Sequence, residues 1–549
     1  MLKKIYSLLE PADRKKCTGM VAVVLLASLL NFAGLASIFP LLKMVLGTDG
    51  ITSDMPLVLV LVLLFVLFKN LAIIGLSRIE TNFLLRQFKH FSYQLFCRYY
   101  QRGLLFVRDK GAVRLANDVN TLCLTFSVSV LQGILTMIGE AVLVLMVVVS
   151  LFVLSPLAAL LLLVACLPLV LFYLFVVRSK VRRYGQADLE ARRKQARMVV
   201  ETFRGFAELE VNNAFEYQLW NFTNGIDTIN ECRRRMEMVK SVPSLLSELA
   251  IILGLALLML VHGSDHLLVG GVFAVAAFRL MPSLRSILSS YTFLQQASYS
   301  VDTLYNEMNE TDEIEESVLP VSFKHSLVAE RVVFGYADGP TVLDGFSCSI
   351  AKGECVGVQG PSGAGKSTLF NILLGFFPLK SGRILIDGKE LTRKNRKQWL
   401  SLVGYVPQDI FIMNASLAEN VALGAKIIDR NLVMKVLEQA QLKDWCLTLP
   451  NGLDCQLGEA GTRLSGGQRQ RIGIARALYK KAEILFFDEA TSALDNDTEQ
   501  EINLTLQNLA NSESGLTMVV IAHRTTSLGF CDRIIKLDDA IDSKIENVQ

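Results

Sequence analysis

Six apolar stretches before residue 291 constrain this chain more than any other feature of its sequence. A helix needs about 20 residues to cross a bilayer, and each stretch reaches that length. Because backbone groups inside lipid must form their hydrogen bonds within the segment, these stretches are expected to be helices. The chain is 52% hydrophobic, which agrees with several membrane spans. The stretches lie near residues 18–46, 57–77, 125–154, 156–178, 242–262 and 267–290.

The positions of lysine and arginine predict how these spans are oriented. The loops 47–56 and 262–266 contain neither residue, whereas segments 78–120 and 179–240 are rich in both. Basic residues concentrate in cytoplasmic loops, so both chain termini are predicted to be cytosolic. We therefore expect a multi-pass protein of the cytoplasmic (inner) membrane. The basic residues before the first span agree with this: Lys3, Lys4, Arg14, Lys15 and Lys16.

The charge, the cysteine content and the N-terminal segment argue against a nucleic-acid partner, a metal or redox site and a cleaved signal peptide. The net charge is only +3, so a nucleic-acid partner is not expected. The ten cysteines include no CxxC pair, which favours structural thiols over a metal or redox site. The first apolar run is longer than the core of a signal peptide, so the first helix is expected to stay in the protein.

The two long cytosolic segments have helical periodicity and few glycines or prolines. Helices of about 40 residues would carry the chain tens of ångströms beyond the membrane. Turn-prone residues near 106–118 and 213–222 predict a reversal between antiparallel helices in each segment. These reversals are either contact points for a second domain or plain surface loops.

The last 220 or so residues change character and predict an α/β domain. Short β-branched runs alternate there with helical ones, as in a nucleotide-binding fold. The acidic stretch 307–316 is the expected linker. We therefore predict a helical transmembrane domain over 1–306 with long cytosolic extensions, a linker over 307–325 and a P-loop NTPase domain over 326–549.

A glycine-rich loop carries the first chemical signal. The sequence from Gly360 to Thr368 fits GxxxxGK[ST], follows the predicted strand 355–359 and opens a helix. Backbone N–H groups of such a loop surround phosphates, and the helix N-terminus favours the anion. Lys366 is expected at the β- and γ-phosphates, and Ser367 at Mg²⁺. The predicted ATP-binding residues of the loop are Gly360, Ser362, Gly363, Ala364, Gly365, Lys366, Ser367 and Thr368.

Two carboxylates at the end of an apolar strand carry the second signal. Asp488 and Glu489 follow Ile484–Phe487. A strand-end aspartate on the same domain as a P-loop is expected to hold the Mg²⁺ shell. Glu489 is then placed to orient or deprotonate the attacking water.

The pentapeptide Leu464-Ser465-Gly466-Gly467-Gln468 is the signature of the ABC ATPases, and the whole domain resembles that family. The resemblance implies further site residues. Tyr336 is similar to the aromatic that stacks on adenine, and Gln408 to the glutamine that contacts Mg²⁺. Asp495 resembles the D-loop aspartate, and His523 the switch histidine near the γ-phosphate. Glu489, His523 and Gln408 are thus the expected catalytic group.

The family's geometry implies a dimer. In this family Leu464–Gln468 and Asp495 face the P-loop of the opposite domain, so that two copies enclose ATP. The chain carries one copy, and its motifs, Glu489 included, are intact. A homodimer with two competent sites is the expected assembly, because closed symmetric dimers are the commonest solution. A heterodimer with a second gene product is the alternative.

Spans that precede the ATPase domain resemble the exporter class of ABC proteins. The chain also resembles the bacterial lipid-linked oligosaccharide flippases of protein N-glycosylation. This likeness includes Met1–Lys4, Phe278–Ser283, Ser290-Tyr291, Glu140 and Glu248. Two features depart from that family. Only 47–56 connect the first two spans, in place of an external amphipathic helix, and the cavity arginines are matched in part.

Charged residues inside spans point to a cargo site. A charge there costs about 2.5–3.5 kcal/mol on insertion scales and normally faces a cavity or a partner. Lys69 and Arg279 would line a basic cavity for a phosphate-bearing headgroup. Arg285, which lies one position away from a cavity arginine of the resembled family, is a third candidate. The alternative is that Lys69 and Arg279 form buried ion pairs with Glu140 or Glu248. Pro282 is expected to kink the last span.

The sequence therefore predicts an ATP-hydrolysing, Mg²⁺-dependent exporter or flippase for an amphipathic, lipid-linked glycan, with membrane lipid around it. The alternatives are a peptide or hydrophobic drug exporter and, in another class, an ATP-gated regulator or channel.

Overall fold

The computed structural model describes residues 1–37, 55–262, 267–310, 320–336, 339–458, 461–488, 496–510, 516–522, 528–537 and 545–547. Met1–Asp312 and Glu313–Gln549 form two compact units, each with its own buried apolar core. The limits of the predicted linker stay a prediction.

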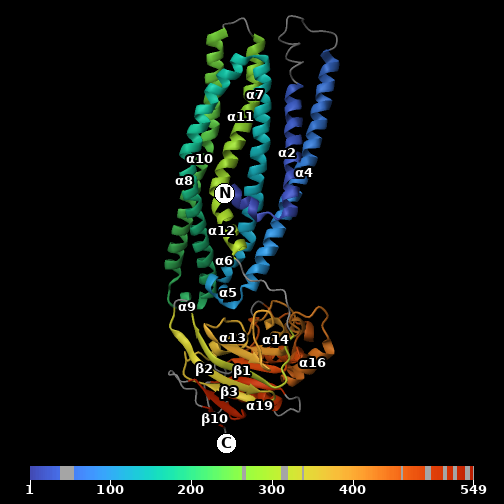
Figure 1. Ribbon diagram of the computed structural model, residues 1–549, viewed down its shortest axis with the longest axis vertical. Coiled ribbons are helices and arrows are strands. Elements are labelled where there is room, and N and C mark those ends of the chain that lie inside the picture. Colours follow the sequence, from blue (N-terminus) through green and yellow to red (C-terminus); the bar gives the residue numbers. More distant parts are fainter. Residues whose placement is uncertain are drawn as a thin grey trace. The chain divides into compact units, whose positions relative to one another are not determined.

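The first unit consists of helices (Figure 1). Within the described ranges, three helical stretches are long and apolar enough to cross a membrane: Pro11–Ala36, Pro56–Gln101 and Ala112–Leu154. The count of six spans stays a prediction. The long helices are α2 (Pro11–Ala36), α4 (Met55–Gln101), α7 (Gln132–Leu154), α8 (Pro156–Arg204), α10 (Phe215–His262) and α11 (Leu267–Gln296).

These helices pack in a continuous series. α2 packs on α4 and on α7, α7 packs on α11, and α8 and α10 pack on each other and on α11. Gly139 allows one close approach, because a Cβ there would lie 2.6 Å from Val24 Cγ1 of α2. At the same place the Ser28 hydroxyl donates to the Gly139 carbonyl across 2.8 Å. Small residues thus bring α2 and α7 together, as is usual between membrane helices.

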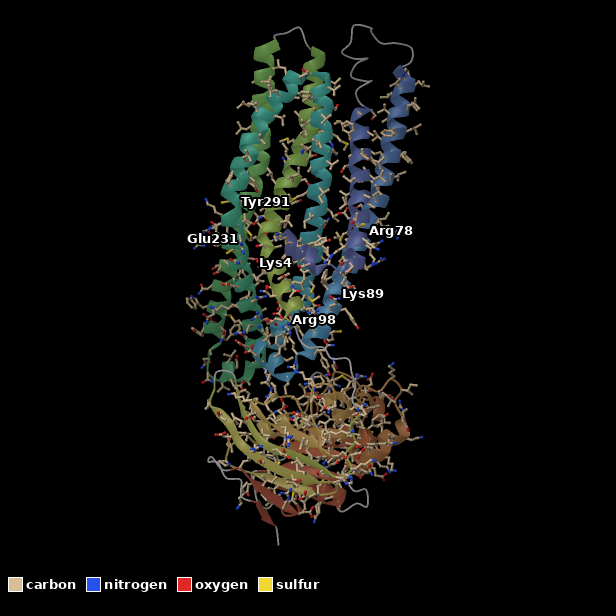
Figure 2. The ribbon with its side chains drawn as sticks, viewed as in Figure 1. Lys4, Arg78, Lys89, Arg98, Glu231 and Tyr291 are labelled. Atoms are coloured by element: carbon tan, nitrogen blue, oxygen red, sulfur yellow. The ribbon has the colours of Figure 1, made fainter. Side chains whose placement is uncertain are left out.

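Shorter helices complete the unit. α5 (Leu104–Lys110) and α6 (Ala112–Asn117) occupy the first predicted reversal, and α9 (Phe206–Val211) precedes the second. The second reversal is shorter than predicted, because residues from Phe215 onward already belong to α10. Two π-helical segments, η1 (Asp118–Leu122) and η2 (Thr125–Leu131), lead into α7. Near the chain start, α1 (Leu2–Leu8) packs on α12 (Ser298–Asn309), where Lys4 pairs with Asp302 (Figure 2).

Two sheets form the frame of the second unit (Figure 1). The four-stranded antiparallel sheet has the order β2-β1-β4-β5, and the six-stranded sheet has the order β10-β9-β3-β8-β7-β6. In the larger sheet only the β9–β10 pair is antiparallel. The strands are β1 (Ser326–Gly335), β2 (Thr341–Ala351), β3 (Cys355–Gln359), β4 (Ser381–Ile386), β5 (Lys389–Glu390), β6 (Val403–Val406), β7 (Ile484–Asp488), β8 (Thr517–Ile521), β9 (Arg533–Lys536) and β10 (Ile545–Asn547).

The buried core of this unit lies around the central parallel strands. Every residue of β7 and of β8 is buried, which explains why both read as continuous apolar runs. The Phe486 ring of β7 meets Phe370 edge-on, with 5.2 Å between ring centroids. The helices of this unit are α13 (Lys366–Leu373), α14 (Arg396–Leu402), α15 (Leu417–Val421), α16 (Arg430–Gln439), α17 (Lys443–Thr448), α18 (Gly466–Tyr479) and α19 (Asn496–Ala510).

Candidate functional site

The carboxyl ends of four neighbouring parallel strands bring several of the predicted site residues to one edge of the sheet. In register, Val358 of β3 lies beside Ile521 of β8, and Ile521 lies beside Asp488 of β7. Phe487 of β7 pairs in turn with Val406 of β6. The P-loop follows β3, and Gln408 comes two residues after β6, at the same edge. Ligands of open α/β sheets bind at this edge, so the fold brings distant motifs together.

The loop after β3 has the backbone shape that a phosphate cradle needs. Gly363 and Gly365 have φ of +90° and +89°, a region that side chains other than glycine rarely enter. A Cβ on Gly360 would lie 2.5 Å from the Leu537 carbonyl oxygen. Ser362 is exposed at the loop tip and Ala364 is half-buried. The loop therefore fits a phosphate chain because its glycines remove the obstructing side chains.

Lys366 lies beneath this loop and is 5% exposed. Its Nζ donates to the carbonyl oxygens of Gly360 and Pro361, at 2.9 and 3.0 Å. Lys366 is also the first residue of α13, so the amine and the helix N-terminus converge on one place. An anion there would meet a cation and oriented N–H groups together.

Ser367 and Asp488 meet across the sheet edge. The Ser367 hydroxyl donates to Asp488 Oδ1 at 3.0 Å, and Asp488 is 5% exposed. A hydroxyl and a carboxylate at this separation form an oxygen set of the kind that Mg²⁺ takes beside phosphate oxygens. Their chemistry fits the predicted metal.

Tyr336 stands at the opening of the site. Its hydroxyl bonds to Thr368 Oγ1 at 3.2 Å, and its ring stands edge-on to Phe334 and Phe377 at centroid distances of 5.3 and 6.0 Å. The side chain remains 41% exposed, which leaves ring surface for a flat base. Gln408 is exposed. Glu489, Asp495 and His523 lie outside the described residues.

The signature pentapeptide begins α18 with a reciprocal cap. Ser465 Oγ accepts from the Gln468 N–H, and Gln468 Oε1 accepts from the Ser465 N–H at 2.9 Å. Leu464 and Gly467 are buried, whereas Ser465 is exposed and Gly466 half-buried. This arrangement presents the N-terminus of a 14-residue helix at the surface, where the helix dipole favours an anion.

The sequence did not single out Arg476 of α18. Its guanidinium donates to the backbone carbonyl and side-chain oxygen of Asn420 at 2.6 and 2.8 Å, and to the Phe411 carbonyl at 2.5 Å. Burial lowers the pKa of Arg476 to about 10. Asn420 is 0% exposed and donates to the Met413 carbonyl at 3.0 Å. The segment after Gln408 is therefore held by α18. The available sequence signal was an arginine within the otherwise apolar run 472–479.

The predicted cavity residues lie on different helices. Lys69 of α4 is half-buried against α2, because a Cβ on Gly34 would lie 2.7 Å from Lys69 Cδ. Arg279 of α11 is half-buried and Arg285 is exposed. Within the described part of the chain, neither Lys69 nor Arg279 forms an ion pair with Glu140 or Glu248. α2 and α7 lie between α4 and α11 in the packing series, so the helix packing does not set Lys69 beside Arg279.

The parallel sheet, the glycine loop and the strand-end aspartate define a P-loop ATPase unit joined to a helical membrane unit. The ABC transporter family matches residues 343–492. An ATP-dependent lipid A-core flippase of Burkholderia pseudomallei (strain 1710b) is 30% identical over 460 residues, or 81% of this chain and 76% of that protein. The protein of the same name from Burkholderia orbicola is 29% identical over 98% of this chain and 91% of its own length.

The chain belongs to the ABC transporter family, as an exporter whose membrane domain is fused to its ATP-binding cassette. The expected ABC exporter and its ATP-coupled translocase activity are thereby confirmed. The fold is also that of a solved structure titled a bacterial Atm1-family ABC exporter with ATP bound. The TM-score is 0.79 at 24% identity, over 96% of this chain and 93% of that one.

Proposed function

We propose that this exporter is a flippase that moves an amphipathic, lipid-linked glycan across the cytoplasmic membrane. The observation that carries the proposal is the likeness to proteins named ATP-dependent lipid A-core flippases, at 30% identity over 81% of the chain. A glycan on a lipid anchor is the common chemistry of such a cargo and of the oligosaccharide carriers that the sequence resembles. The membrane half must then hold an anionic headgroup beside apolar chains.

Lys69 supports this cargo class. Its aliphatic part lies against the Gly34 backbone of α2, and no described carboxylate pairs with its amine. An amine in a membrane span that has no counter-ion among the described residues favours a charged guest, because an unpaired charge in a membrane interior is costly. In our proposal Lys69 and Arg279 contact the phosphate of the cargo from two walls, since their helices are not direct neighbours. Arg285, which is exposed, would act near the cytosolic entrance.

The proposed ATP site uses the groups at the sheet edge. Tyr336 stacks on the adenine, the loop from Gly360 to Thr368 surrounds the phosphates, and Lys366 moves from the loop carbonyls to the phosphate oxygens. Ser367, Gln408 and Asp488 would hold Mg²⁺, which when bound offsets the negative charge of the phosphates. Glu489 orients the water and His523 contacts the γ-phosphate.

A second copy completes each proposed site. Leu464, Ser465, Gly466, Gly467, Gln468 and Asp495 of one subunit face the ATP that is held by the other. The exposed N-terminus of α18 supports this role, because its free dipole end would meet the γ-phosphate. We propose a homodimer with six spans per chain and with both termini and the ATPase domains in the cytosol. A heterodimer remains the competing assembly.

Reconstituted vesicles test the cargo. Purified protein in proteoliposomes is given lipid-linked oligosaccharides, core-bearing lipid A, short peptides and hydrophobic cations, and ATP hydrolysis and movement across the bilayer are measured. The proposal expects both to rise only with a lipid-linked glycan. Stimulation by peptides or cations alone would favour the competing exporter of peptides or drugs. ATP-dependent channel currents without vectorial transport would favour a gate.

A further inference from the structure

Two helices of the membrane unit form a separate arm. α8 and α10 run side by side and are joined by the short helix α9 (Figure 1). Together, residues 156–262 are called the arm here. The arm packs on the other helices mainly through α11 and α7, and it reaches α6 near its cytosolic end. Inside the arm, the Arg235 guanidinium lies over the Tyr184 ring at 5.6 Å, so α10 and α8 hold each other.

A partly buried ion pair joins the arm to the segment before α7. Arg193 of α8 donates from Nη2 to Asp118 Oδ1 at 3.0 Å, and Asp118 is 1% exposed. The second carboxylate oxygen receives the Tyr99 hydroxyl at 3.4 Å and has Arg114 Nε at 3.9 Å. The guanidinium nearest to this buried carboxylate therefore comes from the arm. Pulling the arm away would leave Asp118 with weaker partners in a poorly solvated place.

The junction leaves some polar atoms unsatisfied. Among described residues, Arg193 Nε and Asp188 Oδ1 are buried and have no hydrogen-bond partner. Tyr299 of α12 lies in the same region, where burial, opposed by the charge of Arg193, raises the pKa of its hydroxyl. Buried donors and acceptors without partners cost free energy. These unpaired groups therefore raise the free energy of the closed junction, and a second arrangement of its side chains that pairs them would lower it.

Asp118 also lies on an irregular helical segment. It begins the π-helical turn η1, and two residues separate the end of η1 from a second π-helical run, η2. A π-helical turn holds one residue more than an α-helical one, and such turns are frequent at functional sites. Conversion of η1 to α-helix would shift the position of Asp118 about the helix axis relative to the residues that follow η1. The ion pair and the irregular helix thus coincide at one residue.

We propose that Asp118 and Arg193 form a latch between the arm and the segment η1–α7, closed in this structure and opened during each transport cycle. The latch does not depend on which cargo the exporter carries. It requires only that ATP turnover be coupled to separation of the arm from η1.

A reversible cross-link tests the latch. In Asp118→Cys/Arg193→Cys, a thiol-specific cross-linker that contains a reducible disulfide should join the arm to η1, because an arginine and an aspartate together span more than a direct disulfide does. Peptide mass spectrometry identifies the link among the native cysteines. ATP turnover in proteoliposomes should then fall by about tenfold, within the range of coupling between distant sites, and a reductant should restore it. The matched control is Tyr184→Cys/Arg235→Cys, which links α8 to α10 inside the arm and should leave turnover unchanged.

A second variant tests the latch in case the double-cysteine protein does not fold. Asp118→Asn keeps the shape but weakens the attraction to Arg193, so an opened latch should raise basal ATP turnover even though loss of the ion pair lowers the melting temperature. Arg193→Gln, which removes the other partner, should raise turnover in the same way. Full activity of the cross-linked Asp118→Cys/Arg193→Cys protein would overturn the proposal, as would unchanged or lower turnover in folded Asp118→Asn.

Discussion

The Ser367 hydroxyl donates a hydrogen bond to Asp488 Oδ1 at 3.0 Å, although 121 residues separate them in the chain. The contact arises because β8 alone lies between β3 and β7 in the sheet. The residues that follow β3 and those that end β7 therefore meet at one edge. Two segments that are far apart in the sequence therefore contribute oxygen atoms to one site.

Asp488→Asn tests this meeting point. The amide keeps the volume but loses the charge that would hold Mg²⁺, so ATP hydrolysis should fall roughly 100-fold, as for loss of one electrostatic partner. The dependence of activity on Mg²⁺ concentration should shift to higher values. Asp444→Asn is the control, because Asp444 is exposed on α17. Unchanged Mg²⁺ dependence in Asp488→Asn would contradict the role.

Glu489→Gln separates hydrolysis from binding. The change removes the proposed water-orienting carboxylate and leaves Lys366 and Asp488 in place. Turnover should drop by about 100- to 10,000-fold, the range of general-base catalysis, while ATP binding persists. Fluorescent-nucleotide titration and phosphate release measure the two quantities. Near-native hydrolysis in this variant would refute the assignment of Glu489.

Gly360→Ala tests the shape of the loop. The new methyl group would stand 2.5 Å from the backbone oxygen of Leu537, which cannot rotate aside. Overpacking of this kind costs about 1–3 kcal/mol, so ATP should bind about tenfold more weakly. Gly339→Ala is the matched control, since the nearest atom to its Cβ would be 3.7 Å away. Equal affinity in both variants would show that the loop adjusts freely.

Ser362→Cys/Ser465→Cys tests the two-copy site. Both serines are exposed, and in the proposed dimer the P-loop of one subunit faces the signature of the other. Oxidation with ATP bound should give a disulfide-linked dimer on a non-reducing gel, and each single variant should not. Links confined to one chain would count against the shared site.

Lys69→Gln/Arg279→Gln tests the cargo site. Loss of charge-assisted hydrogen bonds, worth about 1.5–3 kcal/mol each, should lower transport about tenfold or more while basal ATP turnover survives. The melting temperature should hold, because neither residue is in a described ion pair. Arg78→Gln, an exposed cation on α4, is the control (Figure 2). Normal transport of the glycolipid by the double variant would defeat the proposed site.

Local patterns predicted the nucleotide unit well. The strand before Gly360, the helix that starts at Lys366 and the buried strand that ends at Asp488 all follow from short-range rules on glycine, burial and helix starts. The cap at Ser465 is likewise local, since donor and acceptor lie three residues apart. These motifs depend on neighbours in sequence, so a single chain is enough to read them.

The membrane unit was less predictable from the sequence. Apolar composition indicates helices but not which faces meet, so the close approach of Gly139 to Val24 and of Lys69 to Gly34 had no sequence signal. The pairing of Arg193 with Asp118 joins residues 75 apart, and Arg476 donates to Phe411 and Asn420, which lie 65 and 56 residues earlier. Such long-range polar contacts depend on how whole helices are placed, which periodicity does not determine.

The Lys366 amine, held by the carbonyls of Gly360 and Pro361, has a consequence for nucleotide capture. The two carbonyl oxygens serve this lysine as the acceptors that phosphate oxygens would otherwise provide, and the lysine thereby holds the loop in its curved shape. The loop then loses little conformational entropy when the nucleotide binds, so ordering of the loop offsets less of the binding free energy. Product release is favoured for the same reason. The Lys366 amine can exchange the departing phosphates for carbonyl oxygens that already lie within hydrogen-bonding distance. The ATPase domain can therefore bind and release nucleotide while the loop from Gly360 to Thr368 keeps its fold.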